Sequence, residues 1–129
     1  MHKPFIKTAA LLGALSVALG AFGAHALKQL VHDDVISIFE TAVRYQFYHV
    51  FALLFTGILH RDFTNNLVRW AGIFFVTGII LFSGSLYFLT WFKGAGVVGY
   101  NGIGVLTPIG GLSFILGWIC LFAGMFKNK

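Results

Sequence analysis

Charged side chains and cysteine are scarce in this sequence. Asp, Glu, Lys and Arg make up only 10% of its 129 residues, and Cys120 is the single cysteine. An average soluble domain is about 25% charged, so a 14.2 kDa globule could not cover its surface with so few charges. This scarcity excludes a soluble enzyme, and one cysteine excludes both an internal disulfide framework and a cysteine-based zinc site.

Hydrophobic residues take the place of the missing charges. They account for 58% of the chain, with 15 Phe among them, and the mean hydropathy is +0.87. The net charge of +5 does not indicate a nucleic-acid partner, because Lys and Arg stand singly between apolar runs instead of clustering. Such spacing is typical of membrane proteins. We therefore expect the lipid bilayer as the main partner, and neither a metal nor a cofactor.

Three uncharged stretches are long enough to span a bilayer, since about twenty helical residues match the roughly 30 Å hydrocarbon core. Another stretch, between Arg44 and Arg61, is short by itself, so we extend that helix outward through Glu40 and Thr41. The fold class that we predict is an all-α membrane protein, a bundle of four transmembrane helices in one domain. The expected helices cover about residues 5–27, 40–60, 68–92 and 108–126.

The first and last helices have starts that the sequence leaves ambiguous. Lys3, Lys7 and the first apolar run also resemble a secretory signal peptide, but the run is long and no soluble domain follows it, so we expect an uncleaved helix. Glycines break the last uncharged run, and Thr107 and Pro108 then resemble an N-cap and a first helical position. The segment 28–41 resembles a short amphipathic or re-entrant piece at the surface.

An even number of crossings places both termini on the same side of the membrane. Six basic residues would lie on that side and three on the other, which favours a cytoplasmic location for both termini. The six are Lys3, Lys7, Arg61, Arg69, Lys127 and Lys129, and the three are Lys28, Arg44 and Lys93.

Small residues recur every three or four positions in the first and last helices. In membranes, such stripes let helices approach closely, so both are expected to face neighbouring helices. The stripes are Ala9, Gly13, Ser16, Gly20 and Gly23 in the first helix, and Gly110, Ser113, Gly117, Cys120 and Gly124 in the last.

Polar residues gather in the half of the predicted bundle that lies opposite the termini. This cluster consists of His25, Glu40, Arg44, Tyr45, Gln46, His49, Ser83, Ser85, Tyr87, Thr107, Pro108, Gly110 and Gly111. Ionisable residues at such depth usually face the bundle interior. The cluster either fixes helix packing or handles a ligand, proton or ion.

Spacing within the cluster gives more specific expectations. Glu40 and Arg44 stand four residues apart in the order that favours a helical ion pair. His49 is expected to be neutral and hydrogen-bonded to Tyr45, Ser83 or a neighbouring carbonyl. The helix start after Thr107 would suit an anionic group, although ordinary capping is the favoured explanation.

Four blocks in this order carry a family resemblance: Gly20-Ala-Phe-Gly-Ala-His-Ala-Leu27, Phe39-Glu-Thr-Ala-Val-Arg-Tyr-Gln-Phe-Tyr-His49, Phe82-Ser-Gly-Ser-Leu-Tyr87 and Thr107-Pro-Ile-Gly-Gly111 with Gly117-Trp118. The sequence resembles the DUF423 family of small four-helix membrane proteins, to which the eukaryotic transmembrane protein 256 is similar. The resemblance implies a multi-pass protein of the bacterial inner membrane, with no activity and no catalytic residues to carry over.

The function that we expect is therefore that of a small multi-pass membrane protein without enzymatic activity. It would act as a structural, accessory or lipid-contacting module, alone, as a homo-oligomer or in a larger complex. The alternative is binding or transport of a small anionic or amphipathic molecule through the polar cluster. An intramembrane enzyme is a weaker hypothesis, because no nucleophile is evident beside the acid–base groups.

Overall fold

The computed structural model describes residues 1–96 and 102–127, and throughout them the regular structure is helical. The elements are α1 (Lys3–Ala24), the 3-10 turn η1 (Leu27–Gln29), α2 (Asp33–Leu59), α3 (Asn66–Gly78), the π-helical segment η2 (Ile79–Ser83), α4 (Gly84–Gly94) and α5 (Ile103–Gly124). Lys129 and the middle of the expected glycine-rich loop lie outside the described residues.

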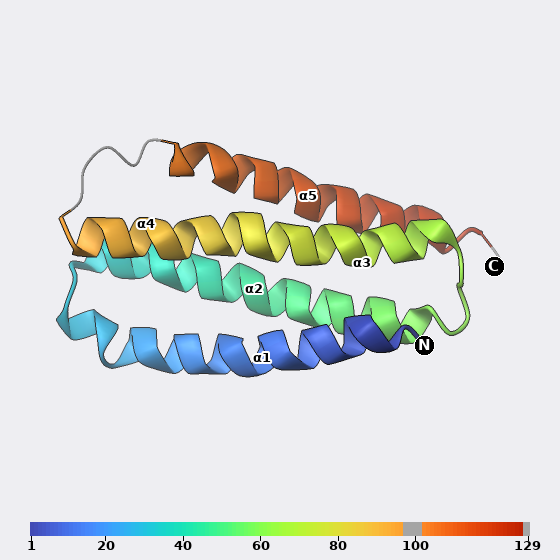
Figure 1. Cartoon of the computed structure of the whole chain (residues 1–129), viewed down its shortest axis with the longest axis horizontal. Coiled ribbons are helices and arrows are strands. Elements are labelled where there is room, and N and C mark those ends of the chain that lie inside the picture. Colours follow the sequence, from blue (N-terminus) through green and yellow to red (C-terminus); the bar gives the residue numbers. More distant parts are fainter. Residues whose placement is uncertain (97–101, 128–129) are drawn as a thin grey trace.

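The helices run antiparallel in chain order, as a row of neighbours (Figure 1). Helix α2 contacts α1 on one side and the continuous α3–η2–α4 helix on the other. Helix α5 packs on the α3–η2–α4 helix and completes the row. Both termini lie at the same end of the row (Figure 1), as the sequence predicted. The all-helical membrane fold is confirmed, and three helices are long and apolar enough to cross a membrane: Lys3–Gln29, Asn66–Gly94 and Ile103–Gly124.

Two expected helix starts are wrong. Helix α2 begins at Asp33, seven residues earlier than residue 40, because Asp33 and Asp34 suit the positive end of the helix dipole and Ile36 and Phe39 are buried against Leu27. The expected surface piece 28–41 is therefore part of η1 and the first turns of α2.

Helix α5 begins at Ile103, so Pro108 lies inside the helix instead of at its first position. A proline there removes a single hydrogen bond, the one that its missing N–H would make to the fourth residue before it. That loss falls near the helix end. The anion site expected at a helix start after Thr107 therefore does not exist in this form.

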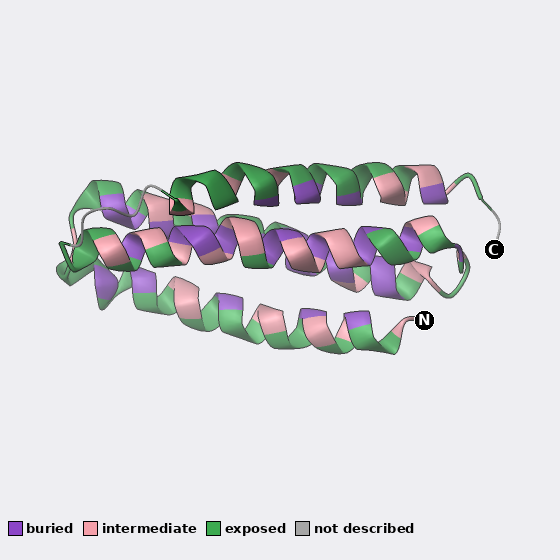
Figure 2. Cartoon of the chain, turned by 45° about the horizontal axis from the view of Figure 1, so that its top comes forward, coloured by how far each residue is buried: buried purple, intermediate pink, exposed green. Residues whose placement is uncertain are grey.

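The two predicted stripes of small residues do face neighbouring helices. On α1, Ala9 and Ser16 are buried, and a Cβ atom added to Gly20 would meet Val43 of α2 at 3.6 Å. On α5, Gly117 faces the ring of Phe75. The outer faces of α1 and α5 are mostly exposed (Figure 2), as expected where lipid surrounds the protein.

Aromatic rings fill the space that glycines leave at helix contacts. Phe5 of α1 packs on Gly72 of α3, and Phe114 of α5 packs on Gly78, just before η2. A Cβ atom at either glycine would overlap the ring. These contacts belong to the main core cluster, in which Phe75 is fully buried.

Candidate functional site

Gln46 lies at the centre of the polar cluster and joins three helices. Its side chain is 1% exposed. Its Nε2 donates a hydrogen bond to the carbonyl of Leu12 in α1 (3.2 Å), and its Oε1 accepts one from the hydroxyl of Tyr87 in α4 (2.6 Å). Gln46 thereby fixes α1 and α4 on either side of α2.

His49, three residues further along α2, has a partner at each ring nitrogen. Nδ1 lies 2.7 Å from the carbonyl oxygen of Tyr45, and Nε2 lies 3.1 Å from the indole Nε1 of Trp118 in α5. Because an indole N–H can only donate, Nε2 accepts and Nδ1 carries the proton, which makes the ring neutral. The expected bond to a neighbouring carbonyl is present, and the ring also stacks on Phe114 with centroids 3.5 Å apart.

Hydroxyl groups connect the remaining helices. Ser83 in η2 donates to the carbonyl of Ala42 in α2 (2.8 Å), and Ser85 in α4 shares a hydrogen bond with Thr107 in α5 (2.6 Å). Ser113 of α5 donates to the carbonyl of Phe74 in α3 (2.8 Å). Within residues 1–96 and 102–127, no buried polar side-chain atom lacks a hydrogen-bond partner.

Three residues of the predicted cluster lie apart from this network. His25 caps α1 and is exposed, and Glu40 and Arg44 are exposed on α2. The predicted ion pair between Glu40 and Arg44 is wrong, because in the described part of the chain the only ion pair within 4.0 Å joins Arg61 and Asp62. The i,i+4 spacing places the two side chains on the same face of α2, but their charged groups do not come within ion-pair distance.

The other predicted residues pack around α5. Gly110 faces the backbone of η2 so closely that a Cβ atom added to it would lie only 2.7 Å from the Cα atom of Phe82. Tyr45, Pro108 and Gly111 line a groove of about 580 Å³ that also reaches His49. We call this the His49 groove.

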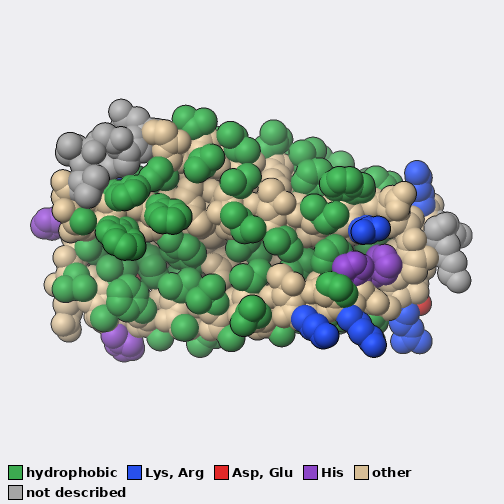
Figure 3. Space-filling view, in the orientation of Figure 1, with side chains coloured by type: hydrophobic (Ala, Val, Ile, Leu, Met, Phe, Trp, Pro, Cys, Tyr) green, Lys and Arg blue, Asp and Glu red, His purple; other side chains and the backbone are tan. Residues whose placement is uncertain are grey.

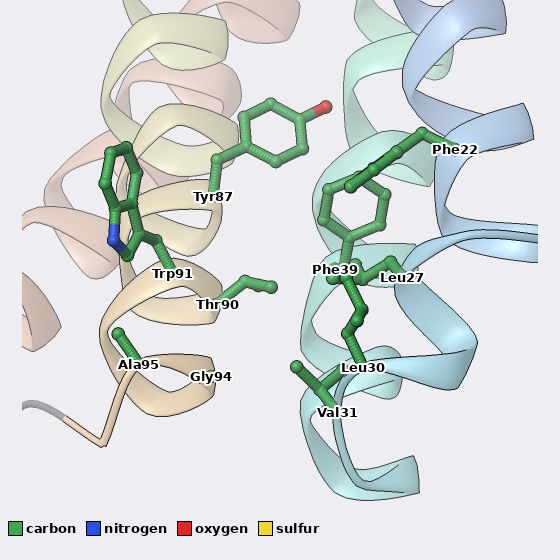
Figure 4. Close-up of a pocket in the computed structure, with 10 residues that line it drawn as sticks. All are labelled: Phe22, Leu27, Leu30, Val31, Phe39, Tyr87, Thr90, Trp91, Gly94 and Ala95. Atoms are coloured by element: carbon green, nitrogen blue, oxygen red, sulfur yellow. The ribbon is translucent and has the colours of Figure 1, made fainter.

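A second groove lies between α1–η1 and α4, at the end opposite the termini, and we call it the Trp91 groove. Its volume is about 430 Å³. Figure 4 shows side chains from both sides facing the space between the helices. The lining is apolar apart from Thr90, the Tyr87 hydroxyl and the Trp91 indole N–H, and consists of Phe22, Leu27, Leu30, Val31, Phe39, Tyr87, Thr90, Trp91, Gly94 and Ala95.

The end that carries the termini holds polar contacts that the sequence reasoning missed. Asn65 caps α3 through its Oδ1 and donates from Nδ2 to the carbonyls of Gly124 and Lys127, both at 2.9 Å. An Asn two residues before apolar residues, here Leu67 and Val68, is a recognisable N-cap signal. Its second role could not be found without knowing that α5 ends beside it.

His2 and His60 also meet at this end. The Nδ1 atom of His2 accepts a hydrogen bond from the backbone N–H of Phe5 (3.3 Å), and the two imidazole centroids are 5.2 Å apart. Burial lowers the pKa of both histidines, and the positive charge of Arg69 lowers both further. On the face in Figure 3, Lys and Arg gather at this end, while hydrophobic side chains cover the remainder.

This arrangement defines a small integral membrane protein whose inward-facing polar groups hold helices together. Comparison with known proteins gives the family. The family described as "Protein of unknown function (DUF423)" matches residues 19–111. The chain is 43% identical over 125 residues to a UPF0382 membrane protein of Staphylococcus aureus, covering 97% of each chain.

A UPF0382 membrane protein of Haemophilus influenzae is 38% identical over 130 residues, covering 100% of this chain and 98% of the relative. No solved structure shows a significant match. The chain belongs to the DUF423 family, as the four sequence blocks indicated. Its relatives are bacterial membrane proteins by name, and neither they nor the family carries a stated activity.

Proposed function

We propose that this protein is a non-enzymatic, lipid-contacting module of the bacterial cytoplasmic membrane that holds one lipid acyl chain in the Trp91 groove. The observation that carries the proposal is the groove itself, an apolar opening of about 430 Å³ between α1–η1 and α4. Tyr87 and Thr90 of α4 point across it toward Phe22 and Phe39, and the ring of Trp91 lies along α4 at its edge. An acyl chain matches such a lining because it has no polar atoms to satisfy.

The position of the groove supports this choice of ligand. Trp91 is 69% exposed and precedes Lys93 and the end of α4 at Gly94. Tryptophan is enriched at the level of lipid headgroups, so the groove would open at that level. An acyl chain could enter while its headgroup stays at the surface.

The polar cluster has a structural role in this proposal. Gln46, His49, Ser83 and Ser85 are buried, and each is hydrogen-bonded. A group that already has its partners has little capacity left for a substrate. The cluster would keep α1 and α4 at the separation that leaves the groove open.

Retention of lipid after purification tests the proposal. The protein is reconstituted in nanodiscs of phosphatidylglycerol and phosphatidylethanolamine, and native mass spectrometry counts the lipids that stay bound. Val31→Trp fills the groove and should abolish retention of one lipid. Val105→Trp adds the same ring at an exposed position outside the groove and should leave retention unchanged. Equal retention by both variants contradicts the proposal.

A second candidate function is binding of a small amphipathic molecule in the His49 groove. It is favoured by Tyr45, which lines that groove, is 38% exposed, and has a hydroxyl with no hydrogen-bond partner among the residues that the structure describes. A ligand that protects the protein against heat in the wild type but not in Tyr45→Phe would support this function.

The proposed membrane arrangement has four crossings with both termini in the cytoplasm. The charged α2 is supported as a span by its position between α1 and α3–α4, alongside both (Figure 1). The basic residues at the end with the termini favour the cytoplasmic side for that end. Alkaline phosphatase fused to the C-terminus should be inactive, and an active fusion would refute the orientation.

A further inference from the structure

Glu40 and Arg44 lie on a face of α2 that no other described helix covers. Both side chains are exposed. They belong to a stripe of exposed residues that follows one side of α2, spaced three or four apart: Ser37, Glu40, Arg44, Tyr48, Phe51, Phe55 and Ile58. We call this the Glu40–Arg44 face. Apart from Ser37, Glu40 and Arg44, the residues of this face are aromatic or aliphatic, which suits contact with lipid or with another helix.

The depth of these two charges follows from an interhelical hydrogen bond. Ser83 donates to the carbonyl of Ala42 (2.8 Å), so Ala42 lies level with Ser83. Trp91 follows Ser83 by eight residues, which is about 12 Å along the helix. Glu40 and Arg44 flank Ala42 and therefore lie well below the level of Trp91, in the hydrocarbon layer.

Charges at this depth are costly unless they are paired, and they usually face a protein interior. Neither Glu40 nor Arg44 has an ion-pair partner within 4.0 Å in the described part of this chain. Beside them lies a shallow groove of about 240 Å³, whose α1 side is formed by Gly20, Gly23 and Ala24.

We infer that the Glu40–Arg44 face binds a second copy of this chain, giving a parallel dimer with two reciprocal ion pairs. Copies inserted in the same orientation are related by a two-fold axis along the membrane normal, and such an interface pairs residue i with j and j with i. Glu40 of each copy then faces Arg44 of the other. Four residues of helix separate their levels by about 6 Å, which the long Arg side chain can span.

Charge complementarity favours a second copy over a lipid at this surface. An anionic headgroup would be attracted by Arg44 but repelled by Glu40, and the headgroup region lies nearer Trp91. A half-rotation about the membrane normal leaves like charges at the same level, but it places Glu40 of each copy on the same side of the axis as Arg44 of the other, so the opposite charges pair diagonally. The inference concerns a different surface from the Trp91 groove, and either can hold without the other.

Charge-reversal variants test the dimer directly. In liposomes at high lipid-to-protein ratio, single-molecule photobleaching of labelled protein measures the dimer fraction. Glu40→Arg gives copies with two positive charges, and Arg44→Glu gives copies with two negative charges. Each alone should dimerise at least tenfold more weakly than the wild type. Mixing the two variants should restore pairing as heterodimers, and the double variant Glu40→Arg/Arg44→Glu should restore the homodimer.

A cysteine pair provides an independent readout. In a Cys120→Ser background, Ser37→Cys on the Glu40–Arg44 face should form a disulfide between copies under mild oxidation. Val105→Cys is an exposed control on α5 and should not. The inference is overturned by a monomeric wild type, by a dimer insensitive to both charge reversals, or by equal cross-linking at both positions. If the charge-reversal variants fail to fold, the inference is still overturned when Ser37→Cys, in the Cys120→Ser background with Glu40 and Arg44 unchanged, forms no cross-link.

Discussion

Replacing Gly110 by alanine should separate α5 from the π-helical segment η2. A Cβ atom at Gly110 would lie 2.7 Å from the Cα atom of Phe82 and 2.8 Å from the carbonyl carbon of Leu81. Both are backbone atoms, so no side-chain rotation can relieve the overlap. The backbone N atom of Phe82 would lie closer still. Carbon atoms prefer separations of about 3.5 Å or more, so the helices must move apart by roughly 1 Å.

The free-energy cost has two parts. Overpacking of a well-packed contact costs about 1–3 kcal/mol, and a contact with backbone should fall at the upper end. The movement also stretches two interhelical hydrogen bonds on either side of Gly110. One joins the hydroxyls of Ser85 and Thr107, and in the other Ser113 donates to the carbonyl of Phe74. Such bonds contribute about 0.6 kcal/mol each in membranes. The expected loss of stability is about 3–4 kcal/mol.

The adjacent residue supplies the control. A Cβ atom at Gly111 would lie 3.9 Å from the nearest atom, Cδ2 of Phe82, which is an ordinary contact. Both substitutions change helix propensity equally, so that effect cancels in the comparison. Unfolding in mixed micelles with increasing SDS, followed by circular dichroism, measures both variants. If Gly110→Ala is as stable as Gly111→Ala, the close approach of α5 to η2 is wrong.

Three further outcomes are expected. Tyr87→Phe should destabilise the protein by about 1 kcal/mol in SDS unfolding because it leaves Oε1 of Gln46 without its donor, and an unchanged midpoint would contradict that bond. In a double-mutant cycle, His49→Phe and Trp118→Phe should be coupled by about 0.6–1.7 kcal/mol, whereas additive effects would show that the two rings do not interact. Because the pKa of His2 is lowered in the folded state, the unfolded chain binds more protons. Thermal stability should therefore fall as the pH drops below about 6.5, and His2→Asn, which keeps a capping oxygen, should reduce that dependence.

Patterns in the sequence predicted the helices and the contact faces of α1 and α5, because both depend on local composition. Apolar runs of sufficient length define spans, and small residues every three or four positions define a close-packing face. The start of α5 was mispredicted because Thr107 and Pro108 look the same at a helix start as they do one turn inside it. There, the hydroxyl of Thr107 bonds to Ser85 of α4 instead of capping its own helix.

The candidate site was predicted as a group of residues but not as a set of bonds. Depth in the membrane follows from position along each helix, so the convergence of Gln46, His49 and Ser83 could be expected. Which atoms meet depends on helix rotation, which the sequence does not encode locally. That is why Trp118 was missed as the partner of His49, and why Glu40 and Arg44 were expected to pair within one chain.

The π-helical segment η2 takes up one extra residue inside a membrane helix without turning its two halves relative to each other. The residues after it lie about 100° behind their positions in a regular α-helix of the same sequence. Before η2, Phe75 of α3 faces α5 at Gly117, and after it, Tyr87 of α4 faces α2 at Gln46. Deleting one residue from Ile79–Leu81 would leave a straighter, fully bonded helix of nearly the same length. Because the wide turn only takes up the extra residue, the shortened helix should keep Phe75 facing Gly117 and Tyr87 facing Gln46.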